Sequence, residues 1–231
     1  MTNPLIHHFE NEDEFWQTAL EDTVLCIKDT LRKHKVCHLG LAGGSTPKTL
    51  YEKLAGAVLP WERIKIIQLD ERYVPSDHPE SNLGMLRKSL LKRVPIPPGN
   101  IISFDTALPY VSAAEEMDRK LTALHEAGRP LLDCLILGAG ADGHIASLFE
   151  GDTDFHSSHY AINTHAKGYI SPLRLTLTLK ALEEASCGLL LLKGSEKESI
   201  LEALKGNISE PHLTALKLLA SKVTLEVLYF A

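Results

Sequence analysis

The chain has 231 residues, of which 44% are hydrophobic and 23% are charged, and its formal net charge at pH 7 is −6. This composition is typical of a globular protein and excludes an extensively disordered chain, and the length suits one large core, so we expect a single domain over residues 1–231. The negative charge argues against nucleic acid as a partner, because binding to a phosphate backbone requires a broad basic surface.

Residues 1–10 lack the apolar core of a signal peptide, and no apolar stretch approaches the length that a membrane-spanning helix needs. We therefore expect a cytoplasmic protein that does not bind membranes. Cys26, Cys37, Cys134 and Cys187 are far apart in the sequence, lie in apolar runs and form no Cys-x-x-Cys pair. We expect them to be reduced core residues.

Apolar runs typical of buried strands alternate with segments of helical periodicity. The expected strands are residues 36–41, 64–69, 131–137, 173–177, 188–192 and 223–229. The expected helices are residues 12–34, 47–54, 82–92, 112–127, 179–185, 196–204 and 213–220, and Gly128 and Gly206 suit the ends of two of them. The alternation predicts an α/β fold: a three-layer α/β/α sandwich with a mainly parallel, Rossmann-like sheet.

The first expected strand leads into Gly43, Gly44, Ser45 and Thr46, and Pro47 then begins a helix. The glycines free backbone N–H groups, the two hydroxyls can donate or cap the helix, and the helix dipole favours an anion, so the pattern predicts a phosphate site. An ordinary capped turn between strand and helix would also use these residue types. The loop is not a Walker loop, because it lacks the Gly-Lys-Ser/Thr ending.

The second expected strand ends at the charged run Asp70, Glu71 and Arg72. Open parallel sheets bind ligands at the carboxyl ends of their strands, which gives these charges a possible role, although solvated charges are also common there. Arg72 can hold an anionic oxygen in a forked geometry, and Asp70 can orient a hydroxyl or an imidazole.

The third expected strand leads into a glycine-rich loop that ends in Asp142, Gly143 and His144. Residues 145–149 look like the start of a helix, and a neutral histidine at a helix N-terminus would be a suitable general base near pH 7. A histidine that only caps the helix is the alternative. Gly138, Gly140 and Gly143 also satisfy the Gly-x-Gly-x-x-Gly dinucleotide pattern, which we discount because it comes late in the chain and bulky residues follow it.

Two further cations are notable. Lys197 falls in the first turn of an expected helix, where a lysine opposes the dipole and an anionic ligand would explain it, although it could simply be solvated. Arg174 enters an apolar strand, which is costly unless a carboxylate or a ligand pairs with it.

Several acidic and imidazole side chains fall in one Ser-rich stretch without the tight spacing of metal ligands, so we expect no metal site there. They are Asp152, Asp154, His156, His159 and His165. His38 lies in an expected strand and is interpreted as a hydrogen-bonded core or edge residue.

Taken together, the motifs resemble those of 6-phosphogluconolactonases, which belong to the glucosamine-6-phosphate isomerase/deaminase-like fold group. The motifs that carry the resemblance are residues 43–47, 70–72, 80–82, 138–149 and 174–178 and the Gly194/Lys197 turn. The resemblance implies hydrolysis of 6-phospho-D-glucono-1,5-lactone to 6-phospho-D-gluconate in the oxidative pentose phosphate pathway, without a cofactor. It also implies a phosphosugar lactone as the partner, with the protein acting as a monomer or a homodimer.

The related deaminases carry Asp-Glu-Tyr where this chain has residues 70–72, and Asn-Glu-Pro after an Ala-Phe pair where it has residues 147–151, so both places favour the lactonase. The chain departs from the lactonase pattern at Glu150, where proline is frequent, and at a proline-rich lead-in reduced to Ser171 and Pro172. These departures bear on the shape of the substrate-side loop. The alternatives are an aminosugar-phosphate isomerase/deaminase, a non-catalytic sugar-phosphate sensor of the same fold and, less favoured, a dinucleotide-dependent dehydrogenase.

The mechanism expected from this resemblance uses His144 as the base that activates water and returns the proton to the departing ring oxygen. Asp142 or Asp70 would orient the imidazole, and backbone N–H groups of residues 140–143 would stabilise the oxyanion. The residues expected to bind substrate and phosphate are Gly43, Gly44, Ser45, Thr46, Arg72, Gly143, Arg174 and Lys197.

Overall fold

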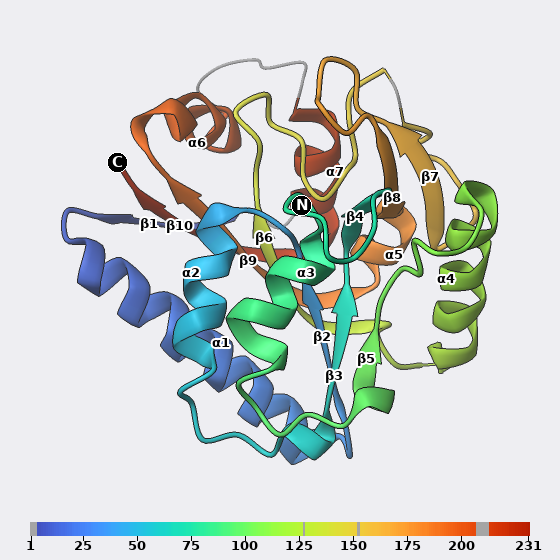
Figure 1. Ribbon diagram of the computed structural model, residues 1–231. Coiled ribbons are helices and arrows are strands. Elements are labelled where there is room, and N and C mark those ends of the chain that lie inside the picture. The colour runs from blue at the N-terminus through green and yellow to red at the C-terminus, as the bar shows by residue number, and fades with distance from the viewer. Residues whose placement is uncertain (1–3, 127, 152, 207–212) are drawn as a thin grey trace.

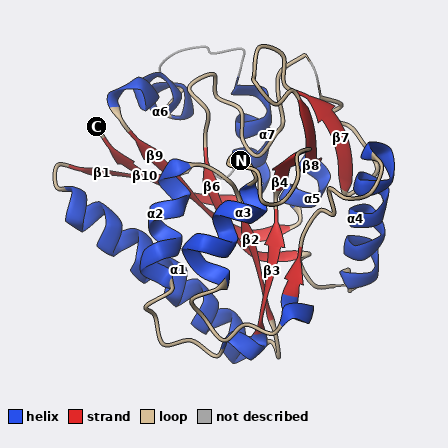
Figure 2. Ribbon diagram, viewed as in Figure 1, coloured by secondary structure: helices blue, strands red, loops and turns tan. Residues whose placement is uncertain are grey.

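The computed structural model describes residues 4–126, 128–151, 153–206 and 213–231. Its main sheet has seven parallel strands in the order β1-β10-β9-β6-β2-β3-β5. The bounds are Leu5–Phe9 (β1), Cys37–Leu41 (β2), Ile64–Gln68 (β3), Ile101–Ile102 (β5), Leu132–Gly138 (β6), Ala185–Lys193 (β9) and Thr224–Phe230 (β10). Figure 2 shows these strands running through the middle of the molecule with helices around them.

The helices are Glu12–Lys33 (α1), Ser45–Leu54 (α2), Asn82–Leu86 (α3), Tyr110–Leu124 (α4), Leu179–Glu183 (α5), Glu198–Leu204 (α6) and Thr214–Lys222 (α7). A π-helical turn, Arg87–Leu91, continues α3, and 3-10 turns occupy Trp61–Arg63, Pro98–Asn100 and Ser195–Lys197. Asn11 caps α1, since its side-chain oxygen accepts the N–H groups of Asp13 and Glu14 at 2.8 and 3.4 Å. Among the helices in these ranges, none is both long and apolar enough to cross a membrane.

The apolar side chains form two cores, one on each face of the main sheet. Successive residues of β6 alternate between them: Cys134 and Ile136 pack with α1, α2 and α3, whereas Leu135 and Leu137 pack with α4 to α7. Period-two alternation of this kind arises because neighbouring side chains of a strand point to opposite faces. The predicted three-layer α/β/α sandwich is therefore confirmed (Figure 1).

A second, smaller sheet was not predicted. It consists of β4 (Asp70–Arg72), β8 (Leu173–Leu177) and β7 (Ala161–His165), paired antiparallel in the order β4-β8-β7. Figure 1 shows β7 and β8 beside α4. The bounds predicted for residues 173–177 are correct, but the strand does not belong to the parallel sheet as expected.

Four other points of local structure differ from the prediction. α2 begins at Ser45 rather than at Pro47, and the edge strands β1 and β5 were missed. α4 ends at Leu124, short of the predicted end at residue 127, which lies outside the described residues. The helix expected over residues 145–149 is absent, because this stretch consists of turns and isolated bridges.

Candidate active site

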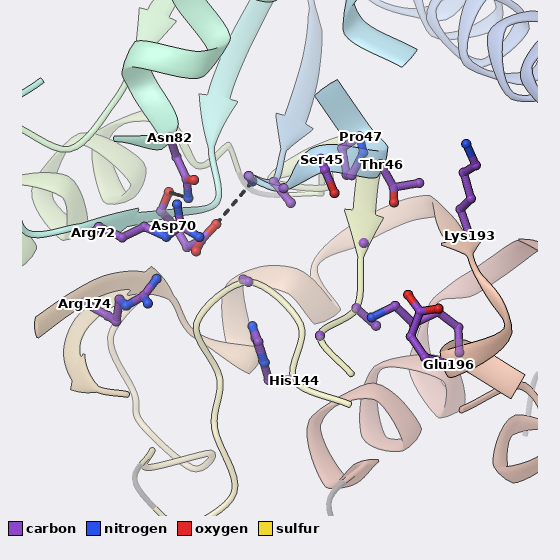
Figure 3. Close-up of a pocket in the computed structure, with 18 residues that line it drawn as sticks. Ser45, Thr46, Pro47, Asp70, Arg72, Asn82, His144, Arg174, Lys193 and Glu196 are labelled. Atoms are coloured by element: carbon purple, nitrogen blue, oxygen red, sulfur yellow. Dashed lines mark hydrogen bonds between the residues drawn. The ribbon is translucent and has the colours of Figure 1, made fainter. Parts of the chain in front are cut away.

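A cavity of about 280 Å³ lies where the carboxyl ends of β2, β6 and β9 meet the small sheet. Most of the predicted site residues line it: Gly43, Gly44, Ser45, Thr46, Asp70, Arg72, His144, Arg174 and Lys197. Figure 3 shows Arg72, Asp70 and Arg174 towards one side of this view and Ser45, Thr46 and Glu196 towards the other. The predicted residues Asp142 and Gly143 do not line the cavity but immediately precede His144.

The loop after β2 presents the N-terminus of α2 to this cavity. Gly44 occupies the N-cap position with φ +111°, a conformation that glycine adopts without strain, and no side chain caps the helix. Ser45 and Thr46 are therefore residues of the first helical turn, not caps as predicted. Gly43 packs against the amide of Asn82 so closely that an added Cβ would overlap it.

The loop after β6 folds back on itself instead of starting a helix. Gly143 and Ala146 have positive φ values of +83° and +49°, which are incompatible with helical propagation. The N–H of Gly140 donates to the carbonyl of His144 at 2.8 Å, and that of Gly143 donates to the carbonyl of Gly140 at 3.0 Å. The argument from a helix dipole at His144 is therefore wrong, and neither of these glycine N–H groups is free to bind an oxyanion. A dinucleotide site of this kind requires a helix N-terminus directly after the glycine-rich loop, and no helix begins there.

His144 is held by a carboxylate. Its Nδ1 lies 2.5 Å from Oδ1 of Asp142, whose Oδ2 accepts the hydroxyl of Tyr169 at 3.0 Å. Burial by itself would raise the pKa of Asp142, but the hydrogen bond and the charge of His144 outweigh it and lower this pKa well below the usual range. The carboxylate is therefore ionised near neutral pH and fixes the imidazole through Nδ1. Among the described residues, no hydrogen bond engages Nε2, and His144 lines the cavity.

Two rings and one glycine complete the surroundings of this pair. The centroids of the Phe149 and Tyr169 rings lie 4.4 and 5.9 Å from that of the His144 ring. Gly140 is also in close contact with the pair, because a Cβ added to it would overlap the imidazole of His144 and the carboxylate of Asp142. Sequence reasoning missed Tyr169, because it lies in a separate loop and no local pattern connects it to His144.

Asp70 joins three loops and does not hydrogen-bond to His144. One carboxylate oxygen accepts the hydroxyl of Ser147 at 2.8 Å, and the other accepts the N–H of Gly43 at 3.4 Å. The amide of Asn82 donates to the Asp70 carbonyl at 3.0 Å. Of the two carboxylates expected to orient the imidazole, Asp142 therefore makes the contact and Asp70 does not.

Glu71 organises the same region, which the sequence did not reveal. Its buried carboxylate accepts the backbone N–H groups of Arg72, Asn82 and Leu83 at 2.7–2.8 Å. The side chains of Gln68 and Ser81 add donors at 2.9 and 3.0 Å. These bonds tie β4 to the start of α3, so that Arg72 and Asn82 both face the cavity.

Arg72 and Arg174 are directly opposite each other in the antiparallel pair β4 and β8. Arg174 is 5% exposed; its Nε donates to the carbonyl of Ser171 at 2.8 Å, and its guanidinium carbon lies 5.4 Å from the centroid of the Tyr169 ring. Burial lowers the pKa of Arg174, and the charge of Arg72 lowers it further. Within the described ranges neither arginine forms an ion pair, and the buried Nε of Arg72 has no hydrogen-bond partner. Like charges opposite one another are unfavourable, so the pair is suited to an anion between them.

The loop after β9 supplies the remaining charges. Lys197 lies in the 3-10 turn that leads into α6, one residue before the helix itself, and lines the cavity. Lys193 also lines it, although its ammonium forms an ion pair with Glu12 at 2.5 Å. Glu196, which directly precedes Lys197, lines the cavity as well.

The imidazoles discounted as metal ligands lie apart from this cavity. His159 pairs with Asp118 at 3.1 Å, and the carboxylate of Asp154 accepts the backbone N–H of His156. Over the described ranges these side chains form no cluster that could hold a metal, and Asp152 lies outside those ranges. His38 is buried, with Nδ1 at 3.0 Å from the carbonyl of Leu131, as a core histidine would be.

Comparisons with known proteins agree with this architecture. Residues 10–223 match the family described as glucosamine-6-phosphate isomerases/6-phosphogluconolactonase. The chain is 35% identical over 195 residues to the 6-phosphogluconolactonase of Thermotoga maritima, covering 84% of this chain and 86% of the relative. It is 34% identical over 184 residues to the Homo sapiens 6-phosphogluconolactonase, covering 77% and 71%.

Solved structures give the same result. The crystal structure of the Thermotoga maritima 6-phosphogluconolactonase superposes with a TM-score of 0.83 at 32% identity, covering 98% of this chain and 99% of that one. The 6-phosphogluconolactonase from Trypanosoma cruzi superposes with a TM-score of 0.86 at 25% identity, covering 100% and 96%. The chain therefore belongs to the glucosamine-6-phosphate isomerase/6-phosphogluconolactonase family.

Proposed function

We propose that this protein hydrolyses 6-phospho-D-glucono-1,5-lactone to 6-phospho-D-gluconate, the reaction of the oxidative pentose phosphate pathway for which its relatives are named. The observation that carries the proposal is the His144–Asp142 pair beside a cavity that also holds Arg72, Arg174 and Lys197. A base and a cluster of cations in one cavity suit an anionic substrate that reacts with water.

In the proposed reaction, Nε2 of His144 accepts a proton from water as the water oxygen attacks the lactone carbonyl. The tetrahedral intermediate then collapses, the bond between the carbonyl carbon and the ring oxygen breaks, and the imidazolium returns its proton to that oxygen. The product is the open-chain carboxylic acid, which ionises. Asp142 accepts Nδ1–H throughout, so that Nε2 is the unprotonated nitrogen that faces the water.

The phosphate of the substrate is proposed to bind at the N-terminus of α2. Ser45 and Thr46 offer hydroxyls and N–H groups there, and Lys197 adds a positive charge from the loop after β9. Arg72, together with Arg174, supplies forked donors to oxygens of the same phosphate from the other side of the cavity. Binding of the phosphate, which is remote from the reacting carbonyl, would hold that carbonyl in position beside His144. The binding energy of the phosphate would in this way orient the substrate for reaction.

The experiment follows acid release from freshly prepared lactone, after subtraction of spontaneous hydrolysis. His144→Ala is compared with the wild-type protein and with His156→Ala, which alters an exposed histidine outside the cavity. We expect kcat to fall by about 10²- to 10⁴-fold in His144→Ala, the usual contribution of general base catalysis, and to stay near the wild-type value in His156→Ala.

Wild-type activity in His144→Ala would show that His144 is not the general base. Ammonia release from glucosamine 6-phosphate without lactone hydrolysis would replace the proposal with the deaminase reaction, and binding without turnover would favour the sensor. A single domain that works in the cytoplasm as a monomer or a homodimer completes the proposal. Sedimentation analysis tests the oligomeric state, and localisation of the tagged protein tests the cytoplasmic location.

A further inference from the structure

Three of the four cysteines, distant in sequence, meet on the α1 face of the main sheet. Cys134 in β6 and Cys187 in β9 are register partners in adjacent parallel strands, so their side chains point to the same face. α1 packs over this face and contributes Cys26. The three sulfur atoms lie within 4.8 Å of one another, and those of Cys26 and Cys187 are 3.2 Å apart.

The sulfur cluster borders a cavity of about 140 Å³, separate from the candidate active site. Asp22, one helical turn before Cys26, and Glu226 in β10 line the same cavity. Oδ2 of Asp22 is buried and has no hydrogen-bond partner among the described residues, whereas Glu226 pairs with His7 at 3.1 Å. Carboxylates beside three thiols favour a cation, and an unpartnered buried oxygen is a group that a cation would satisfy.

We propose that Cys26, Cys134 and Cys187 bind one thiophilic metal ion, with Zn²⁺ as the ion to be tested. Thiolates select soft and borderline ions such as Zn²⁺ over Mg²⁺ or Ca²⁺, and three protein ligands leave a fourth position open towards the cavity. On binding, each thiol releases its proton to solvent and the thiolate forms the bond to the metal, so no oxidant or reductant is needed.

The proposed site has a structural role. Cys134 precedes Gly138, which lines the candidate active site, by four residues of an extended strand, or roughly 13 Å. A metal at the cysteines would join α1, β6 and β9 without touching the substrate. Zn²⁺ should therefore stabilise the fold and leave lactone hydrolysis unchanged.

Metal binding is measured on the full chain after reduction and removal of metal with a chelator. Zn²⁺ is titrated calorimetrically, and Co²⁺ is used as the spectroscopic probe because cobalt–thiolate bonds absorb in the near ultraviolet. We expect one ion per chain, and Kd should rise about 100-fold or more in Cys26→Ser and Cys187→Ser. Cys37→Ser is the matched control, because Cys37 is a buried strand cysteine outside the cluster.

Two measurements on the wild-type protein keep the test independent of whether the variants fold. Zn²⁺ should protect Cys26 and Cys187, which are both partly exposed, from alkylation. At a free Zn²⁺ concentration 100 times Kd, Tm should rise by about 5–10 °C. The proposal is overturned if no stoichiometric binding occurs, or if binding persists in the Cys26→Ser/Cys187→Ser double variant. A Cys26–Cys187 disulfide in the isolated protein, with no metal uptake after its reduction, would overturn it as well.

Discussion

The Asp142 carboxylate is engaged at both oxygens, by His144 on one side and by Tyr169 on the other. An amide in its place could present its NH₂ group to Nδ1 and stabilise the tautomer with the proton on Nε2, which cannot accept a proton from water. We therefore expect Asp142→Asn to lower kcat by about 10²- to 10⁴-fold with little change in KM. Steady-state acid release gives both constants.

The pH profile provides a second test of this pair. The interactions of Asp142 with His144 outweigh burial and lower the pKa of this carboxyl, so Asp142 stays ionised as the pH falls from neutrality through the usual range of an aspartate. Asp142→Asn should therefore lower kcat/KM by a similar factor at every pH in that interval, because the wild-type protein carries the Asp142 charge throughout it. Asp77→Asn, at an exposed aspartate outside the cavity, is the control. An unchanged kcat/KM across the interval would contradict the role of Asp142.

β4 and β8 place Arg72 opposite Arg174. We expect this arrangement to favour substrate binding and to disfavour folding. Replacing Arg174 with Met removes a like-charge contact and a costly buried charge while keeping apolar bulk. We expect the free energy of unfolding to be equal to that of the wild type or up to about 1 kcal/mol higher. KM for the lactone should rise about 10- to 100-fold, because a charge-assisted bond to the substrate is lost.

Urea unfolding and initial rates test both halves of this prediction. Arg32→Met, at an exposed arginine of α1, is the control for loss of one positive charge. A variant of Arg174 that unfolds more easily and retains its KM would show that this guanidinium serves the fold and not the substrate.

The loop after β6 depends on close packing between its backbone and the His144–Asp142 pair. In Gly140→Ala the new methyl group would overlap both side chains, which can move only by leaving their present contact. Displacement of a base by about 1 Å can cost about 10²-fold in rate, so we expect such a fall in kcat. Tm should change little, because the groups that must move are side chains at the rim of a cavity. Gly99→Ala is a matched control, since an added Cβ there meets nothing within 4 Å. Equal rates in the two variants would exclude this packing role.

Local patterns in the sequence predicted most elements but not all of their partners. Residues 173–177 alternate as a strand should, yet nothing local shows that they pair antiparallel with β4 and β7. The loop at His144 was misassigned because Ile145, Leu148 and Phe149 have helical spacing, whereas the positive φ of Gly143 and Ala146 breaks the helix. The cavity residues were predictable because carboxyl ends of parallel strands converge at one edge. Tyr169, Glu71 and the cysteine cluster arise from contacts between distant segments, which periodicity does not encode.

On the scale of the whole molecule, the candidate active site and a buried ion-pair network that joins two strands lie at opposite ends of the sheet. Its carboxyl edge forms the candidate active site, whereas at the opposite end of β6 a buried carboxylate holds two neighbouring strands together. Asp133 is 2% exposed, pairs with Arg129 at 2.9 Å and accepts the backbone N–H of His38 at 2.7 Å. Arg129 in turn donates to the carbonyl of Val36, just before β2. No residue of this network lines the cavity at the carboxyl edge.

Asp133→Ala should therefore separate stability from activity. It leaves the largely buried guanidinium of Arg129 without its carboxylate and the His38 N–H without an acceptor, and breaking a buried pair in this way costs about 3–5 kcal/mol. For a chain of this size the loss corresponds to a fall in Tm of about 6–20 °C. At 25 °C, kcat/KM per folded molecule should equal the wild-type value, because the carboxyl edge is built from other contacts. Calorimetry and acid release on the same sample decide the matter: a reduced kcat/KM with Tm intact would mean that the two ends of the sheet are coupled.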